Sequence, residues 1–227
     1  MKENAGATPQ LHVEGQDDLH TIVHLLERHG VGMDDGVRPI DISPQGTLSN
    51  LIRRMPAAIL VATDRPVGFV LDTDTTPKKR WGQVRERIKK TGAVAPDGCP
   101  TEGFIGRVPD YPCDFGVWLM PDCKTDGGTL ETLLRSLVPT KDRLWQHAES
   151  STGDAKTALG AKFRDQHQLK ASMHCWLAWQ EEPGLPFGTA IKANYFNDDS
   201  PQAMAFLRWL GKLFGIKKLG NVPPATT

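Results

Sequence analysis

The sequence predicts an α/β fold, in which a parallel sheet is flanked by helices and followed by helical additions at the C-terminus. Two observations carry this prediction. Strand-like and helix-like segments alternate up to about residue 138, and acidic residues follow the ends of two strand-like segments. We expect residues 10–140 to form the α/β core and residues 141–220 to form a helical extension packed on it. Residues 1–9 are expected to be a flexible leader and residues 221–227 a disordered tail.

The first elements are a strand, a helix and a second strand. Residues 11–13 favour a strand, which Glu14 and a glycine end. From Asp17 onward apolar residues recur at helical spacing, with Asp17 or Asp18 as the cap, until a glycine ends the helix at position 30. Residues 37–42 then alternate between apolar and polar side chains, as half-buried strands do.

Prolines mark the next elements. Residues 46–64 have helical periodicity, which we expect Pro56 to interrupt. The apolar run 66–71 is typical of a strand buried on both faces. Pro77 suits the first position of a helix, and the basic helix 78–90 follows it.

The remaining elements follow a loop at 92–103 that is rich in proline and glycine. Their apolar runs and helical periodicities define the rest of the prediction. We expect strands at 104–108 and 115–120, and helices at 129–138, 142–150, 160–179 and 201–214.

Composition excludes several classes of protein. Lys plus Arg and Asp plus Glu both number 27, so a generally basic nucleic-acid-binding protein is excluded, whereas a local basic groove is not. No run of 18 apolar residues exists, so we expect no membrane span. The four cysteines form no CxxC pair, and the leader has no apolar signal-peptide core. These features favour reduced thiols and a cytoplasmic protein.

Carboxylates follow two of the predicted strands. Glu14 comes after the first strand, and Asp72 and Asp74 end the apolar strand. Residues two apart in a strand point to the same side, so we expect both aspartates to face one cation. Converging carboxylates repel one another unless a cation compensates them, and Mg²⁺ prefers oxygen ligands. We therefore predict a Mg²⁺ or Mn²⁺ site.

These motifs resemble the Toprim domain, which topoisomerases, bacterial primases, recombination factors and the nuclease half of OLD-family proteins share. The resemblance rests on Val13-Glu14-Gly15-Gln16-Asp17-Asp18 and on the strand ending in Asp72-Thr73-Asp74. It implies a Toprim-like sheet, a general acid/base or metal ligand at Glu14, and Mg²⁺ binding by Asp72 and Asp74. By the same resemblance Asp18 is a further metal ligand, and Glu131 on a later helix is another.

A wider resemblance covers most of the chain. Gly116-Val117-Trp118-Leu119-Met120-Pro121-Asp122 and His174-Cys175-Trp176-Leu177-Ala178-Trp179-Gln180 are similar to segments of a bacterial Toprim-related family that is uncharacterised. This second resemblance therefore implies no activity. Only two tyrosines exist, Tyr111 and Tyr195, which argues against a self-sufficient topoisomerase.

The expected function is Mg²⁺-dependent hydrolysis of phosphodiesters in DNA or RNA. Lys162, Lys170 and Lys192 are candidates for stabilising the developing charge, and the sequence does not choose among them. OLD-like nucleases usually work with an ATPase. No P-loop is present in this sequence, so the resemblance implies a separate ATPase partner and a role in phage defence.

One basic segment begins directly after Asp74. Its side chains have two interpretations, a solvated helix face or a set of contacts to a nucleic-acid backbone. The residues expected to make these contacts are Lys78, Lys79, Arg80 and Arg85.

Two alternatives stay open. Asp72-x-Asp74 also matches the first motif of haloacid-dehalogenase-like phosphatases, with Asp72 as nucleophile and Asp74 as general acid. That alternative predicts that Asp122 and Asp126 face Asp72 and that Glu14 lies remote. The other alternative is a non-catalytic Toprim-fold binding or regulatory subunit whose acidic residues are structural, because a fold does not guarantee an activity.

Overall fold

The computed structural model describes residues 7–33 and 38–220, so most of the expected leader and all of the expected tail lie outside the described residues. Within these ranges the strands form one five-stranded sheet in the order β2-β1-β3-β5-β4. Four strands are parallel, and β4 runs antiparallel to β5 at one edge. The strands are β1 (Gln10–Val13), β2 (Asp41–Pro44), β3 (Val67–Asp72), β4 (Phe104–Arg107) and β5 (Asp114–Met120).

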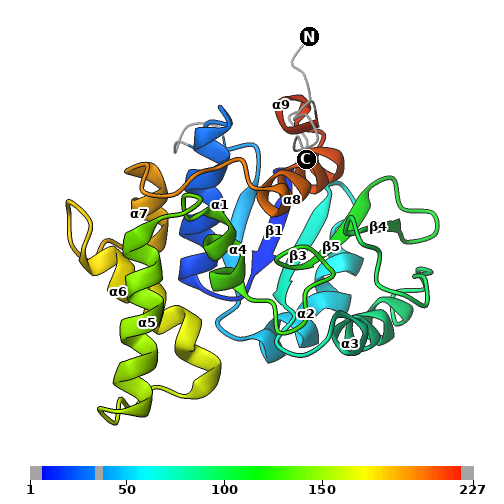
Figure 1. The fold of residues 1–227 in the computed structure, drawn as a ribbon. Coiled ribbons are helices and arrows are strands. Elements are labelled where there is room, and N and C mark those ends of the chain that lie inside the picture. The colour runs from blue at the N-terminus through cyan, green and yellow to red at the C-terminus, as the bar shows by residue number, and fades with distance from the viewer. Residues whose placement is uncertain (1–6, 34–37, 221–227) are drawn as a thin grey trace.

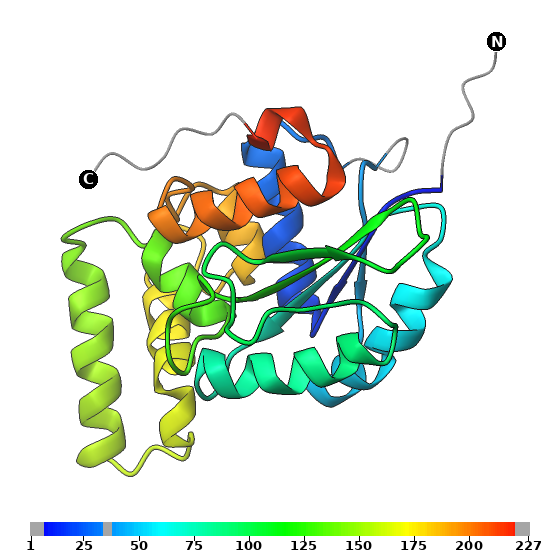
Figure 2. The same ribbon diagram turned by 90° about the vertical axis from the view of Figure 1, so that its right-hand side faces the viewer.

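Helices cover both faces of this sheet, as Figures 1 and 2 show. One layer contains α2 (Leu48–Val61) and α3 (Pro77–Lys89), and the opposite layer contains α1 (Gln16–Arg28) and α8 (Pro201–Phe214). The remaining helices are α4 (Leu130–Leu137), α5 (Arg143–Thr157), α6 (Gln168–Ala178), α7 (Phe187–Lys192) and α9 (Lys217–Gly220). The predicted α/β fold with helical additions is confirmed.

Two glycines let α8 approach the sheet closely. Gly68 and Gly116 are directly opposite each other in β3 and β5. A Cβ atom on Gly116 would lie 2.7 Å from a Leu213 methyl carbon and 2.9 Å from the Trp209 ring. A larger residue at either position would push α8 off the sheet. These glycines therefore fix the packing of the C-terminal helix on the two central strands.

Several boundaries differ from the predictions. The second strand is Asp41–Pro44 rather than 37–42, and Val37 lies outside the described residues. Pro56 does not interrupt α2, which runs through it. The helix loses one backbone hydrogen bond there. Its buried face, which includes Met55 and Ile59, compensates by packing on the sheet.

The expected helix 160–179 is shorter, and two helices are not predicted. Gly160 has φ +73°, a left-handed conformation that excludes it from a helix, and α6 begins at Gln168 after one 3₁₀ turn. The unpredicted helices α7 and α9 have six and four residues, too few for a periodic signal. No helix in the described ranges is long and apolar enough to cross a membrane.

Candidate functional site

The carboxyl edge of the sheet carries the acidic residues that the sequence singles out. β1 and β3 are adjacent and parallel, so Glu14, after β1, and Asp72, the last residue of β3, meet at one edge. A cleft of about 730 Å³ opens there and is lined by Glu14, Asp72, Asp74, Glu131 and Lys170, among others. A smaller cavity of about 290 Å³ is also lined by Glu14 and Asp72 and adds Asp17 and Asp18. The structure therefore brings all five predicted carboxylates together.

Asp72 is partly buried where β3 ends at the cleft. Its Oδ1 accepts a hydrogen bond of 3.1 Å from the Leu130 N–H, in the first turn of α4. Burial raises the pKa of Asp72 well above its usual range, and the charges of Asp18 and Glu14 raise it further. The helix N-terminus favours the anion, but burial and like charges oppose it. Asp72 is therefore a site where a proton or a cation is stabilised.

Asp18 is buried, with 8% of its surface exposed. The prediction that Asp17 or Asp18 occupies the N-cap position of α1 is wrong, because Gly15 occupies it. Asp18 is the third residue of the helix, and its Oδ2 accepts the Gly15 N–H at 2.9 Å. Burial, followed by the charge of Glu14, raises the pKa of Asp18 to about 6.

Glu14 follows β1, just before α1, and accepts a hydrogen bond from the backbone N–H of Leu48 at the start of α2. Burial raises its pKa first and the charge of Asp74 second, while the Leu48 backbone N–H and the Arg80 charge oppose the rise. Glu14 is only partly buried and lines both cavities, so it remains accessible from the larger cleft. It is the carboxylate best placed to exchange a proton with a bound molecule.

The alternation argument for Asp72 and Asp74 is wrong, although both line the cleft. β3 ends at Asp72, and Asp74 has φ 53°, so the chain turns before it reaches Asp74. The Gly128 carbonyl accepts the N–H groups of Thr73 and Asp74 at 2.8 and 3.2 Å. Asp74 then accepts a hydrogen bond of 3.0 Å from Arg80, so the two carboxylates have different partners.

Lys170 is the lysine that the structure selects from the three sequence candidates. Its Nζ lies 3.1 Å from a carboxylate oxygen of Glu131 and 3.6 Å from Asp17, and it lines both cavities. Lys162 and Lys192 are exposed and line neither cavity. Nothing in the local sequence distinguishes Lys170, because only the packing of α6 beside α4 brings it to the site.

The donor set fits a hard cation, but its present arrangement is incomplete. Asp18 and Asp72 form no ion pair within the described ranges, and each faces other carboxylates. Oxygen ligands of this kind suit Mg²⁺ or Mn²⁺. In residues 7–33 and 38–220, however, no three His, Cys, Asp or Glu side chains are already placed to hold a metal ion. Glu14, Asp72 and Asp74 would have to change rotamers to converge on one cation.

Two of the four predicted phosphate contacts have other roles. Arg80 is buried and donates to the carbonyls of Asp72 and Thr73 as well as to Asp74, so it fixes the loop after β3. Arg85 donates to the Ala95 carbonyl and pairs with the Asp97 carboxylate. The other two predicted contacts, in the first turn of α3, are exposed: Lys78 and Lys79.

The aspartates of the phosphatase alternative lie outside the cleft. Asp122 accepts the backbone N–H groups of Lys124 and Thr125 and so caps its own turn. Asp126 is exposed, and neither aspartate lines a cavity that Asp72 lines. Glu14 lies at the cleft rather than remote from it. This geometry differs from the one that the phosphatase alternative predicts.

Comparison with known proteins identifies one family. The family described as "Protein of unknown function (DUF3226)" matches residues 8–215, which is most of the chain and includes every acidic residue of the cleft. No curated protein and no solved structure matches the chain. The activity must therefore be inferred from the chain's own residues.

Proposed function

This chain belongs to the DUF3226 family, and we propose that it is a Mg²⁺- or Mn²⁺-dependent phosphodiester hydrolase of the Toprim type that acts on DNA or RNA. One observation carries the proposal. Glu14, Asp18, Asp72, Asp74 and Glu131 gather at the cleft and the smaller cavity beside it, at the carboxyl end of parallel strands. Repulsion among buried carboxylates is costly unless a cation offsets it.

Each residue has a separate part in the proposed reaction. Asp72, oriented by the Leu130 N–H, and Asp74, oriented by Arg80, are the metal-binding pair. Glu14 accepts a proton from the attacking water, and its raised pKa makes it a stronger base than an ordinary glutamate. Divalent ions, when bound, would activate water and neutralise the leaving oxygen. Lys170 supplies positive charge beside the phosphate.

The proposal extends to a partner and a setting by the resemblance to OLD-like nucleases. An ATPase encoded separately would couple nucleotide hydrolysis to cleavage, and phage defence in the cytoplasm would be the biological context.

A non-catalytic binding or regulatory subunit is the second candidate. It is favoured by the fact that no trio of ligands in the described ranges is already placed around a metal position. It is also favoured by the ion pairs of Glu131 with Lys170 and of Asp74 with Arg80, which already compensate two carboxylates. The phosphatase alternative has no such support, because Asp122 and Asp126 line neither cavity.

The test is cleavage of labelled single-stranded and duplex DNA and RNA in Mg²⁺ or Mn²⁺, with EDTA as the blank. Asp72→Asn keeps an oxygen acceptor for the Leu130 N–H but removes the charge. Asp122→Asn makes the same change outside the cleft and serves as the matched control. A phosphomonoester is assayed beside the nucleic acids.

We expect metal-dependent cleavage by the wild type and by Asp122→Asn, and its loss in Asp72→Asn. Hydrolysis of the phosphomonoester alone, lost in both variants, would favour the phosphatase. Failure of the wild type to cleave any nucleic acid, with and without an OLD-type ATPase, would contradict the proposal and favour the binding subunit.

A further inference from the structure

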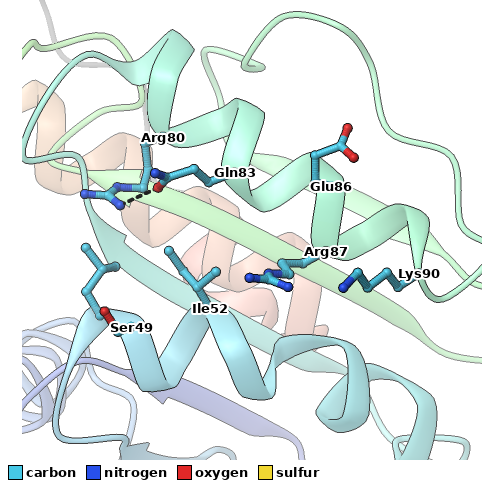
Figure 3. Close-up of a pocket in the computed structure, with 8 residues that line it drawn as sticks. Ser49, Ile52, Arg80, Gln83, Glu86, Arg87 and Lys90 are labelled. Atoms are coloured by element: carbon cyan, nitrogen blue, oxygen red, sulfur yellow. Dashed lines mark hydrogen bonds between the residues drawn. The ribbon is translucent and has the colours of Figure 1, made fainter.

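A basic groove runs between α2 and α3, on the face of the sheet opposite to α8 (Figure 3). Its volume is about 630 Å³. We call it the α2–α3 groove. One wall is formed by α2 and the other by α3, and the lining residues are Leu48, Ser49, Ile52, Arg80, Gln83, Glu86, Arg87 and Lys90.

The positive charges of the groove form a stripe along α3. Arg80, Arg87 and Lys90, with the neutral Gln83 between the first two, recur at intervals of three and four residues, which places them on one helical face. Arg80 is already paired with Asp74, so the uncompensated charges are those of Arg87 and Lys90. From Arg80 to Lys90 the stripe extends about 15 Å along the helix axis, at 1.5 Å per residue. Figure 3 shows Arg87 and Lys90 pointing into the space beside α2.

Arg87 and Lys90 are available to a ligand. Neither side chain forms a salt bridge among the ion pairs of the described residues. The one acidic residue of the lining, Glu86, points away from α2 and pairs with Lys89 at 2.7 Å. The groove therefore presents cations without a matching internal anion, which is the condition for binding a polyanion.

The groove also leads to the acidic cleft. Arg80 lines the groove and donates to Asp74, which lines the cleft. Leu48 lines the groove, and its backbone N–H donates a hydrogen bond to Glu14. A chain lying in the groove would thus reach the cleft at Glu14 and Asp74.

We propose that the α2–α3 groove binds the phosphodiester backbone of one nucleic-acid strand and guides it to the cleft; this rests on the proposed function. Packed helices leave only a surface furrow between them, which a single flexible strand can follow more closely than a rigid duplex can. Arg87 and Lys90 contact the phosphates, as in other electrostatic tracks for single strands. Ile52 and Leu48 offer apolar surface to sugar or base.

The experiment measures binding of a labelled single strand by fluorescence anisotropy in EDTA, so that cleavage does not interfere. The variants are Arg87→Gln with Lys90→Gln, and Ser49→Glu. Ser49 is exposed in the first turn of α2, where a carboxylate stabilises the helix, so Ser49→Glu introduces repulsion without unfolding the protein. The matched control is Lys212→Gln with Lys217→Gln, two exposed lysines of α8 and α9.

We expect the Arg87/Lys90 variant to weaken binding about tenfold or more near 0.1 M salt and to lower the slope of log K against log salt by about 1.4. Ser49→Glu should weaken binding with an unchanged or higher Tm, and the control should bind as the wild type does. A wild type that binds no strand would overturn the proposal, as would a preference for duplex.

Equal binding by the groove variants and the wild type would likewise overturn it. The proposal also fails if Lys78→Gln with Lys79→Gln weakens binding and the groove variants do not. A third outcome is that the wild type binds the strand but does not cleave it, and that only the groove variants lose binding. This result would contradict the proposed hydrolase and would support the proposed strand-binding groove. The two proposals therefore fail separately.

Discussion

The acidic cleft and the α2–α3 groove are neighbours with opposite electrostatics. In the cleft, burial and mutual repulsion raise the pKa values of Asp18, Asp72 and Glu14. In the groove, Arg87 is half-buried and Lys90 is exposed, so solvent reaches both cations. The sequence has equal numbers of acidic and basic residues, but the fold separates them into an acidic cleft and a basic groove. Buried carboxylates with raised pKa values, as in the cleft, are typical of sites that carry out chemistry on a bound group. Solvated cations, as in the groove, attract a polyanion.

The largest expected effect separates chemistry from binding. Glu14→Gln should lower the cleavage rate by about 10²–10⁴-fold, because it removes the proposed base. Strand binding in EDTA should stay unchanged, since Glu14 does not line the groove. Single-turnover cleavage and anisotropy on one preparation measure both quantities. Equal losses in both measurements would show that the two regions are one site.

Arg80 joins the two regions, so its removal should affect both. Arg80→Gln abolishes three hydrogen bonds to the loop after β3, to the carbonyls of Asp72 and Thr73 and to the Asp74 carboxylate. We expect the free energy of unfolding to fall by about 2–3 kcal/mol, because buried acceptors lose their donors. Urea unfolding measures this change. Arg87→Gln, on the same stripe, is the control and should leave stability within about 0.5 kcal/mol.

The pH dependence of stability should come from the cleft. Asp18 titrates near pH 6 when folded and near pH 4 when unfolded, so the folded state holds more protons between these values. Stability therefore falls as pH rises through this interval, by about 1–3 kcal/mol from Asp18. Asp18→Asn should flatten the curve measured by urea unfolding in EDTA. A wild-type curve that rises between pH 4 and pH 6, unchanged in the variant, would contradict this assignment.

Lys170 should contribute little to stability. Its ion pair with Glu131 is partly exposed, so Lys170→Gln should cost less than about 1 kcal/mol in unfolding free energy. The variant also frees Glu131, so we expect tighter Mg²⁺ binding together with slower cleavage. Isothermal titration with Mg²⁺ and a cleavage assay test the two effects. Weaker Mg²⁺ binding would show that Lys170 orients Glu131 rather than competing for it.

The sequence predicts the cleft better than the groove. Glu14 and Asp72 are recognisable as residues at strand ends, and the adjacency of β1 and β3 brings them together as parallel strands should. Asp74 reaches the cleft for a different reason from the one predicted. The strand ends at Asp72, and Asp74 has a positive φ, which aspartate adopts more often than most residues do.

Contacts made across the sequence explain what sequence patterns miss. Lys170 belongs to α6, and only tertiary packing brings it to Glu131 on α4. The stripe that contains Arg87 and Lys90 is visible as spacing, but its meaning depends on α2 lying beside it. Arg80 shows the opposite, since a basic residue expected to face solvent is buried by its bonds to the loop after β3.

The central claim is that the carboxylates of the cleft are arranged for a divalent cation, and thermal unfolding with and without Mg²⁺ tests it most directly. In EDTA at pH 7, Asp72→Asn should have a higher Tm than the wild type, because it removes a carboxylate whose charged form is opposed by burial and by the neighbouring carboxylates. Added Mg²⁺ should raise the Tm of the wild type and of Asp122→Asn, but not that of Asp72→Asn. The account would be contradicted if neither Mg²⁺ nor Mn²⁺ changed the Tm of the wild type and if Asp72→Asn had a lower Tm than the wild type.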